Sequence, residues 1–220
     1  MIITIDGPSS SGKSTAAKLL SKFYSIVHID SGSIYRAITL LALDNNLITD
    51  KKINIQSLIK CLGNNKISFE RDKRNKFQIC INNKYVEKRI RTSKISNNVS
   101  TVATIKEIRE YVLKLQRKIA KNQSIVMDGR DIGSVVFPNA KYKFYLEASL
   151  KNRSERRWNE LKNKEKGISI NDVKLDLNKR DIVDTNREYS PLIIPKNSIV
   201  INSDDLSINH VVDKIIKHIN

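Results

Sequence analysis

The chain has 220 residues, which is enough for one compact domain with an insertion or for two small domains. Hydrophobic residues make up 40% of it and charged residues 29%, and 7 Gly and 4 Pro are too few for a collagen-like or linker-dominated protein, so disordered and fibrous classes are excluded. The net charge of +17 is typical of proteins that bind polyanions. Because the lysines are spread along the chain, we favour a solvated basic surface over a nucleic-acid interface.

The sequence contains no segment typical of membrane or secreted proteins. No stretch approaches the roughly 18 apolar residues of a membrane helix, and Asp6 interrupts the apolar run at 2–5 before it could act as a signal peptide. We therefore expect a cytoplasmic protein with no membrane partner. Cys61 and Cys80 are the only cysteines and form no CxxC pair, so we expect buried thiols rather than a zinc site or a disulfide.

The first part of the chain alternates strands and helices. β-branched runs are followed by turn residues and then by segments with helical spacing. The expected elements are a strand at 2–5, a helix from Thr15, a strand at 25–29 and a helix at 34–43. This alternation predicts a parallel sheet with helices on both sides.

The period of the apolar residues changes to two between Lys66 and Val86, which predicts a small antiparallel sheet inserted into the α/β chain. The later elements that we expect are a helix at 99–121, strands at 125–127 and 142–146, a charged helix from 151 to about 166, a helix at 171–185, a strand at 198–201 and a helix at 206–219. The charge of the 151–166 helix predicts an exposed, mobile arm.

A phosphate-binding loop follows the first strand. The pattern G-x-x-x-x-G-K-[ST] is matched by Gly7, Pro8, Ser9, Ser10, Ser11, Gly12, Lys13 and Ser14. Glycines allow such a loop to wrap a phosphate chain, while backbone N–H groups, the helix N-terminus and Lys13 supply positive potential. Ser14 is positioned to bind magnesium and Thr15 to reach a further phosphate oxygen. We therefore expect the chain to bind ATP or GTP.

Residues elsewhere in the chain indicate which nucleotide binds this loop and which reaction follows. Residues 178–181 spell the guanine-binding pattern N-K-x-D, but within a helical pattern, and the chain has no D-x-x-G segment, so a GTPase is disfavoured. A kinase needs a second anion site and mobile positive charge. Arginines are available for both: Arg36, Arg109, Arg130 and Arg187 for an acceptor, and Arg153, Arg156 and Arg157 on the charged helix.

The histidines show no catalytic pattern. His28, His210 and His218 share no metal or base spacing, so we expect packing or solvent exposure for them. A phosphate monoester, whose second pKa is about 6, needs no base because it is already a nucleophile at neutral pH.

The sequence resembles bacterial cytidylate kinases over almost its whole length. Three segments beyond the phosphate loop show the likeness: DSGSIYRA at 30–37, DGRDIGSVVFP at 128–138, and Arg180-Asp181 with Asp184, Arg187 and SPL at 190–192. The second segment is the most specific, and the β insert also resembles the extra sheet of that family. The resemblance implies transfer of the γ-phosphoryl group of ATP to CMP or dCMP with Mg²⁺. We also expect a monomer with no nucleic-acid partner.

The resemblance also implies roles for single residues. The acceptor phosphate would be bound by Ser31, Arg36, Arg130 and Arg187. Cytosine would be recognised by Ser100, Arg109 and Asp131, and the ribose by Arg180 and Asp184. The catalytic group would comprise Lys13, Arg130, Arg187 and the lid arginines Arg156 and Arg157. Magnesium would be bound by Ser14 and, through water, by Asp128. The chemistry agrees for Asp131, because a carboxylate can accept from the cytosine amine but not from uracil O4.

Two departures and several alternatives stay open. Val183 stands where some relatives are basic, which leaves the sugar preference open, and Ser14 replaces a Gly of many members. Asp128 could be an ordinary strand-end turn residue, and Asp184 with Arg187 only a surface ion pair. A nucleic-acid-stimulated ATPase, or a kinase for UMP or AMP, are the competing functions.

The expected architecture is a P-loop NTPase-like, three-layer α/β fold with a five-stranded parallel sheet, a small antiparallel β insert and a helical lid. Its core would comprise residues 1–30, 100–150 and 171–220. Residues 31–99 would form the acceptor-nucleotide-binding insert and residues 151–170 the lid.

Overall fold

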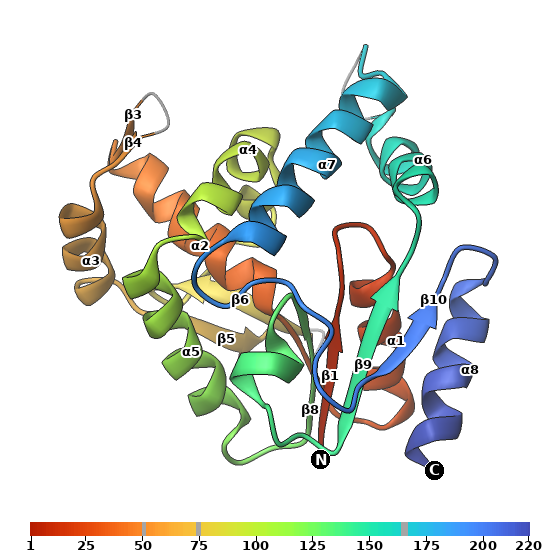
Figure 1. Cartoon of the computed structure of the whole chain (residues 1–220). Helices are drawn as coiled ribbons and strands as arrows, with labels where there is room; N and C mark the ends of the chain where they lie inside the picture. Colours follow the sequence, from red (N-terminus) through yellow and green to blue (C-terminus); the bar gives the residue numbers. More distant parts are fainter. Residues whose placement is uncertain (50–51, 74–75, 164–166) are drawn as a thin grey trace. The chain divides into compact units, whose positions relative to one another are not determined.

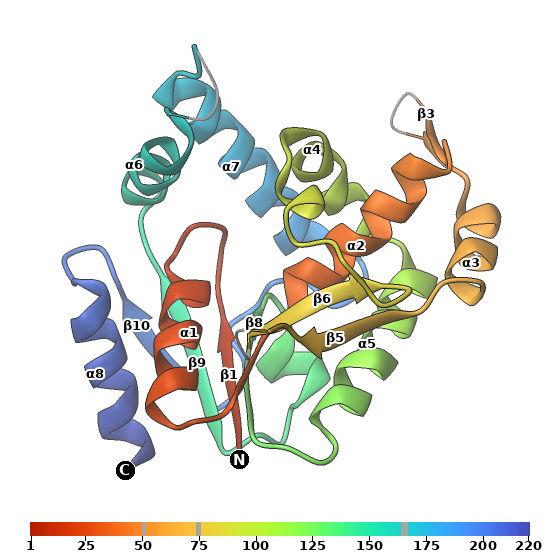
Figure 2. The same cartoon turned by 180° about the vertical axis from the view of Figure 1, so that it is seen from behind.

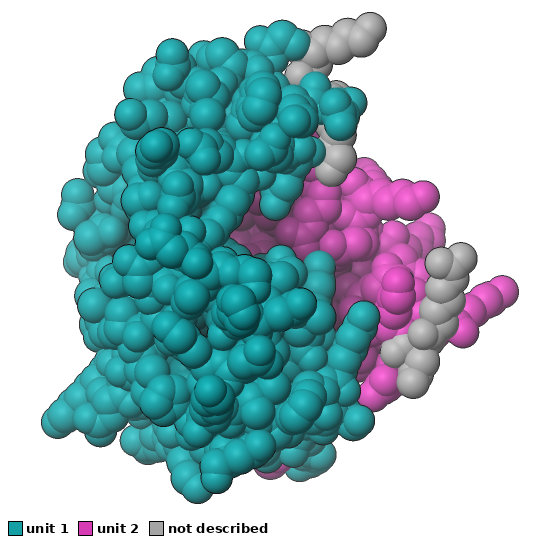
Figure 3. Space-filling view, turned by 90° about the vertical axis from the view of Figure 1, so that its right-hand side faces the viewer, with its two compact units in different colours: residues 1–28, 122–220 teal, residues 29–121 magenta. Residues whose placement is uncertain are grey.

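The computed structural model describes residues 1–49, 52–73, 76–163 and 167–220. The chain divides into two compact units, coloured separately in Figure 3. Unit 1 comprises Met1–His28 and Asn122–Asn220, and unit 2 comprises Ile29–Lys121. Each unit has a hydrophobic core of its own.

The central sheet has five strands in the order β10-β9-β1-β8-β2 (Figure 1). Their bounds are β1 Ile2–Asp6, β2 Val27–Asp30, β8 Ile125–Gly129, β9 Tyr142–Glu147 and β10 Ile199–Asn202. Strand β1 pairs in parallel with β8 and β9, and β9 with β10, so the predicted parallel sheet is confirmed. The apolar runs are buried because helices and loops cover the sheet on both faces.

The helices of unit 1 are α1 Lys13–Phe23, α6 Leu150–Leu161, α7 Ile170–Asn186 and α8 Ile208–Ile219. Figure 2 shows α1 and α8 side by side on one face of the sheet. Their apolar stripes bury Leu20 and Ile215 against Ile3, Ile5 and Phe144 of the strands. Helices α6 and α7 pack on each other beyond the carboxyl ends of β1 and β9, where the phosphate loop also lies (Figure 1).

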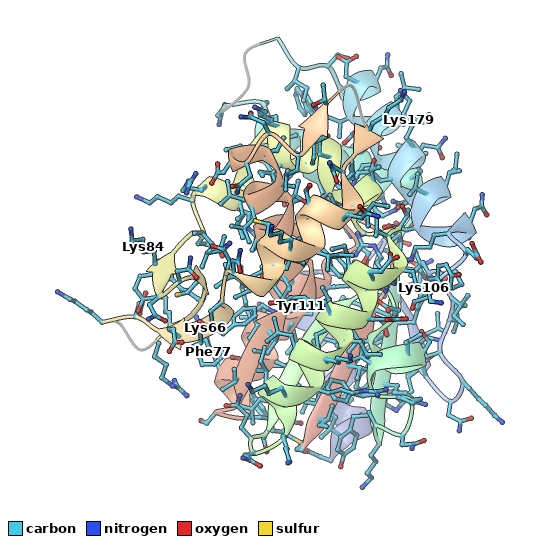
Figure 4. The ribbon with its side chains drawn as sticks, turned by 90° about the vertical axis from the view of Figure 1, so that its left-hand side faces the viewer. Lys66, Phe77, Lys84, Lys106, Tyr111 and Lys179 are labelled. Carbon is cyan, nitrogen blue, oxygen red and sulfur yellow. The ribbon has the colours of Figure 1, made fainter. Side chains whose placement is uncertain are left out.

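Unit 2 is built around helix α2, Ser31–Asp44, which is buried on most of its faces. Around it lie β3 Ile48–Thr49, β4 Lys52–Ile53, α3 Ile55–Gly63, a 3₁₀ turn Arg89–Arg91, α4 Ser93–Val102 and α5 Lys106–Ala120. The predicted antiparallel sheet consists of β5 Ile67–Arg71, β6 Phe77–Ile81 and β7 Lys84–Tyr85. Figure 4 labels Lys66, Phe77 and Lys84 on this sheet and Tyr111 on α5. Tyr111 packs in the same core as strand β5.

Two helix predictions were wrong in extent. The single helix expected at 99–121 is divided into α4 and α5, because Ile105 is extended and the Arg109 side chain donates to the Ala103 carbonyl that the break leaves without a helical partner. The charged helix expected to reach about 166 ends at Leu161, and residues 164–166 of the expected lid lie outside the described residues. Within the described ranges, no helix has the length and apolar character needed to cross a membrane.

Candidate active site

The phosphate loop joins β1 to α1 in a conformation that needs glycine. Gly7 and Gly12 have φ of 145° and 94°, in the region that favours glycine. A Cβ atom on Gly7 would lie 2.1 Å from the carbonyl oxygen of Leu146 in β9. The loop therefore passes directly against the neighbouring strand, and its N–H groups precede the N-terminus of α1, which is an anion-binding arrangement.

Lys13, the first residue of α1, is buried within this loop. Its Nζ atom donates to the Pro8 carbonyl at 2.5 Å and to Ser11 Oγ at 3.3 Å. Burial, and next the charge of Arg130, lower the pKa of Lys13 well below its ordinary value, while Asp128 and Asp6 oppose them. The ammonium group is thus desolvated before any ligand arrives, so an anionic ligand would interact with it strongly. Thr15, two residues further, is exposed.

Ser14 and Asp128 form an oxygen pair beside Lys13. Residues Ile5 and Asp128 face each other in the β1/β8 register, and Ser14 Oγ donates to Asp128 Oδ2 at 2.5 Å. A hydroxyl and a carboxylate are the ligands that a hard cation such as Mg²⁺ prefers. Among the described residues no cluster of three or more His, Cys, Asp or Glu is arranged for a metal.

His28 lies on β2, which is next to β8 in the sheet. Its Nε2 atom lies 2.7 Å from Asp128 Oδ1, and only 14% of its side chain is exposed. The mostly buried side chain agrees with the packing role expected for it, whereas the hydrogen bond to Asp128 was not expected, because the sequence spacing does not reveal it.

Arg130 joins the phosphate loop to helix α7. Its Nη2 atom donates to Ser9 Oγ at 2.7 Å, and its Nε atom donates to Asp184 Oδ2 at 2.8 Å. Burial acts to lower the pKa of Arg130, but the charges of Asp184, Asp181 and other carboxylates raise it on balance. The Gly129-Arg130-Asp131 corner thus lies at the phosphate loop, which is the proximity that a transfer between two phosphate sites requires.

A group of arginines and aspartates continues from Arg130 along α7. Arg187 lies 3.8 Å from Asp131 and 3.7 Å from Asp184, with Nη2 and Nη1 respectively. The exposed fractions are 6% for Asp184 and 9% for Arg187, so the alternative of a surface ion pair is excluded. Burial acts to raise the pKa of Asp184, but Arg130 and Arg187 lower it on balance.

Arg180 completes the cationic side of this group. Its Nε atom is buried and has no hydrogen-bond partner among the described residues. Burial, and next the charge of Arg130, lower the pKa of Arg180. Cations that repel each other in a buried place are stabilised by an anion, so the group around Arg130 has the electrostatics of an anion site.

Asp6 is a functional neighbour that sequence reasoning treated only as the end of an apolar run. Its carboxylate accepts from the N–H groups of Ile132 and Gly133 at 2.7 and 2.6 Å. Burial raises the pKa of Asp6 to about 7, although these two hydrogen bonds lower it. A Cβ atom on Gly133 would lie 2.9 Å from Thr4 Oγ1, so glycine is required for this approach. The feature of the sequence that could have indicated a role for Asp6 is the position of its carboxylate immediately before the phosphate loop.

The arginines of α6 differ from one another. Arg153 is buried, donating to Asp181 Oδ2 at 2.5 Å and to the Ser9 carbonyl at 3.2 Å, so its assignment to a mobile arm was wrong. Arg156 donates to the Ser203 hydroxyl at 3.0 Å and to the backbone carbonyl of Ser203. Arg157 pairs with Glu160 of the same helix. Because Arg153 is bound to both Ser9 and Asp181, α6 begins anchored to the phosphate loop.

The remaining expected residues lie in unit 2, around α2. Ser31 is buried and accepts from Gln116 Nε2 at 2.8 Å. Arg36 donates to the Ile90 carbonyl and to Ser96 Oγ. Arg109 lies over the Tyr35 ring at 5.4 Å, and Ser100 lies on α4. Unit 2 thus contains Ser31, Arg36 and Arg109, whereas the phosphate loop and the Arg130 group belong to unit 1.

Comparisons with known proteins agree with the sequence resemblance. A family model described as "Cytidylate kinase" matches residues 3–220. Cytidylate kinases of Clostridium botulinum (strain Hall), Clostridioides difficile (strain 630) and Fusobacterium nucleatum are 44%, 38% and 41% identical to this chain. The matches cover 97%, 100% and 100% of this chain and 94%, 98% and 97% of those proteins. An uncharacterized protein from Eubacterium ventriosum, 12% identical, shares the fold with a TM-score of 0.53 over 100% of this chain and 98% of that chain.

Proposed function

This chain belongs to the cytidylate kinase family, whose reaction is the ATP-dependent phosphorylation of CMP to CDP, and from that premise we propose how its residues divide the work. The donor triphosphate binds residues 7–15. Loop N–H groups and Lys13 hold the β- and γ-phosphates, and Thr15 contacts a further phosphate oxygen. The desolvated state of the Lys13 ammonium supports this assignment.

The Ser14 hydroxyl and, through water, the Asp128 carboxylate would hold magnesium beside this loop. The 2.5 Å contact between the two side chains supports the assignment, because both donors converge on one point. When bound with ATP, the cation neutralises charge on the phosphates. The Ser14 and Asp128 side chains orient the donor, and Lys13 keeps the γ-phosphate aligned with the acceptor.

The Arg130 and Arg187 guanidinium groups bind the acceptor phosphate, and the family resemblance adds Ser31 and Arg36 to this role. The buried cationic group around Arg130 supports this assignment. Arg130 exchanges its contact with Ser9 for the phosphate, while Asp184 keeps its orientation. A guanidinium binds phosphate in a bidentate manner, which fixes the attacking oxygen.

We assign recognition of the nucleoside to the residues that the family resemblance indicates. Asp131 accepts from the cytosine amine, with Ser100 and Arg109 as further contacts, and Arg180 and Asp184 bind the ribose. Uracil presents an acceptor where cytosine presents a donor, so Asp131 favours CMP over UMP. We propose both CMP and dCMP as substrates, as the family resemblance implies.

Transfer itself needs positioning and charge neutralisation rather than a base. The acceptor oxygen is a nucleophile at neutral pH, so the arginines have only to align it and to neutralise developing charge. Arg156 and Arg157 close over the transferring group and exclude water. The protein acts as a cytoplasmic monomer without nucleic acid, on ATP and free nucleotides.

The observation that supports these roles best is the position of Arg130, which contacts both Ser9 of the phosphate loop and Asp184 of α7. A coupled assay of ADP release with CMP, dCMP, UMP, AMP and dTMP tests the proposal. We expect turnover with CMP and dCMP and far less with the others. Equal rates with UMP, or ATP hydrolysis stimulated by polynucleotide, would contradict it.

A further inference from the structure

His28 is a side chain at the phosphate site to which the roles above give no task. It lies on β2, and its Nε2 atom is 2.7 Å from Asp128 Oδ1. The other carboxylate oxygen, Oδ2, accepts from Ser14 at 2.5 Å. The Asp128 side chain is only 4% exposed. The carboxylate is therefore held from two sides by two different side chains.

The chemistry of this contact defines the direction of the hydrogen bond. An ionised carboxylate only accepts, so Nε2 of His28 carries the proton and donates it. A carboxylate bound at both oxygens cannot rotate freely about its Cβ–Cγ bond. The donation at Oδ1 thereby fixes the orientation of the carboxylate, whose Oδ2 atom faces Ser14.

We propose that His28 is a positioning residue, which orients Asp128 and through it Ser14 for the divalent cation that accompanies ATP. The inference rests on the proposed role of Asp128. His28 touches neither the nucleotide nor the cation, and it acts as the outer partner that ligating carboxylates require. Removal of such an outer partner typically weakens metal affinity about 10- to 100-fold.

The test compares three substitutions of this histidine. His28→Phe keeps a ring and removes the donor, His28→Gln places an amide N–H near the position of Nε2, and His28→Asn places it too short of Asp128. The measurement is Mn²⁺ binding by electron paramagnetic resonance, in the presence of a non-hydrolysable ATP analogue. Binding of ATP is measured separately in excess EDTA. His210→Phe, at an exposed position of α8, is the matched control.

We expect His28→Phe and His28→Asn to raise the Mn²⁺ dissociation constant about tenfold, and His28→Gln to stay within about threefold of the parent. Metal-free ATP affinity and the control variant should not change. Unchanged Mn²⁺ affinity in His28→Phe, or equal losses in the Gln and Asn variants, would overturn the proposal. If His28→Phe fails to fold, the comparison of His28→Gln with His28→Asn still tests the proposal.

Asp128→Asn separates this inference from the roles on which it rests. If it leaves Mn²⁺ affinity unchanged, Asp128 does not serve the cation, and the proposals for both residues fail. If it weakens Mn²⁺ binding whereas His28→Phe does not, only the role of His28 is wrong.

Discussion

The phosphate loop and the Arg130 corner lie next to each other in unit 1, yet they position charge in different ways. The loop does so with its backbone: Lys13 donates to the carbonyl and hydroxyl of residues within five positions of it. The corner does so with ion pairs between distant segments, such as Arg130 with Asp184. Among the described residues Lys13 forms no direct ion pair, so its removal breaks none, whereas removal of Arg130 takes a direct ion-pair partner from the buried Asp184.

The largest expected effect is a loss of activity on substitution of Lys13 in the phosphate loop. Lys13→Met should lower kcat about 100-fold or more, because a fixed cation at the transferring phosphate is lost. The free energy of unfolding should not fall, since burial already disfavours the charged ammonium. Steady-state kinetics and urea unfolding measure the two quantities, with the exposed Lys18→Met as control. A large loss of stability would show that the loop depends on its lysine.

A substitution in the Arg130 corner should change both CMP binding and the free energy of unfolding. Arg130→Ala should weaken CMP binding by about 1.5 to 3 kcal/mol, which is about 10- to 100-fold in KM, through a lost charge-assisted contact. It should also lower the free energy of unfolding by about 3 kcal/mol, because Asp184 loses its nearest cation. Arg89→Ala, which breaks an exposed pair with Asp44, is the control and should change neither. A stable Arg130→Ala protein would erase the contrast between the two regions.

A smaller effect tests recognition of the base at the same corner. Asp131→Ala should lower kcat/KM for CMP about tenfold more than for UMP, because only cytosine offers an amine to the carboxylate. Coupled assays with both nucleotides measure the ratio, and Asp213→Ala on α8 is the control. Equal losses for the two substrates would limit Asp131 to its pairing with Arg187.

The smallest effect concerns Asp6, which links β1 before the loop to the Ile132–Gly133 turn after the corner. Its pKa in the folded protein, about 7, lies above the ordinary 3.8, so the folded state binds the proton more tightly and stability declines as the pH rises between these values. Between pH 6 and pH 7 this group should contribute a loss of about 1 kcal/mol. Urea unfolding of Asp6→Asn and of the parent measures the slope. An Asp6→Asn protein with the parent slope would assign the pH dependence elsewhere.

Much of unit 1 could be predicted because its information is local. A β-branched run, a glycine-rich loop and a helical repeat lie in direct succession, and the strands of the parallel sheet are rich in β-branched and other apolar residues. Family resemblance then placed Arg130, Asp131 and Asp184 at one site. Their contacts with Ser9 and Arg187 are described by the structure and follow from no spacing.

The sequence-based predictions were wrong or incomplete mostly where contacts between residues far apart in the sequence determine the structure. The α4/α5 break escaped prediction because Ile105 fits the apolar stripe and only the Arg109 side chain shows why the helix ends. Arg153 looked like its exposed neighbours on α6 until Asp181, from α7, was seen to pair with it. His28 was missed because its partner follows one hundred positions later. The short helix α3 was overlooked although Asn54 caps it and its apolar residues have helical spacing.

The closeness of Gly7 to Leu146 has a consequence for laboratory evolution of this enzyme. Since any side chain there would collide with the backbone of β9, a library randomised at position 7 should yield poorly expressed or insoluble clones rather than soluble inactive ones. Selections that count only turnover would score such clones as catalytic failures, although their defect arises in biosynthesis.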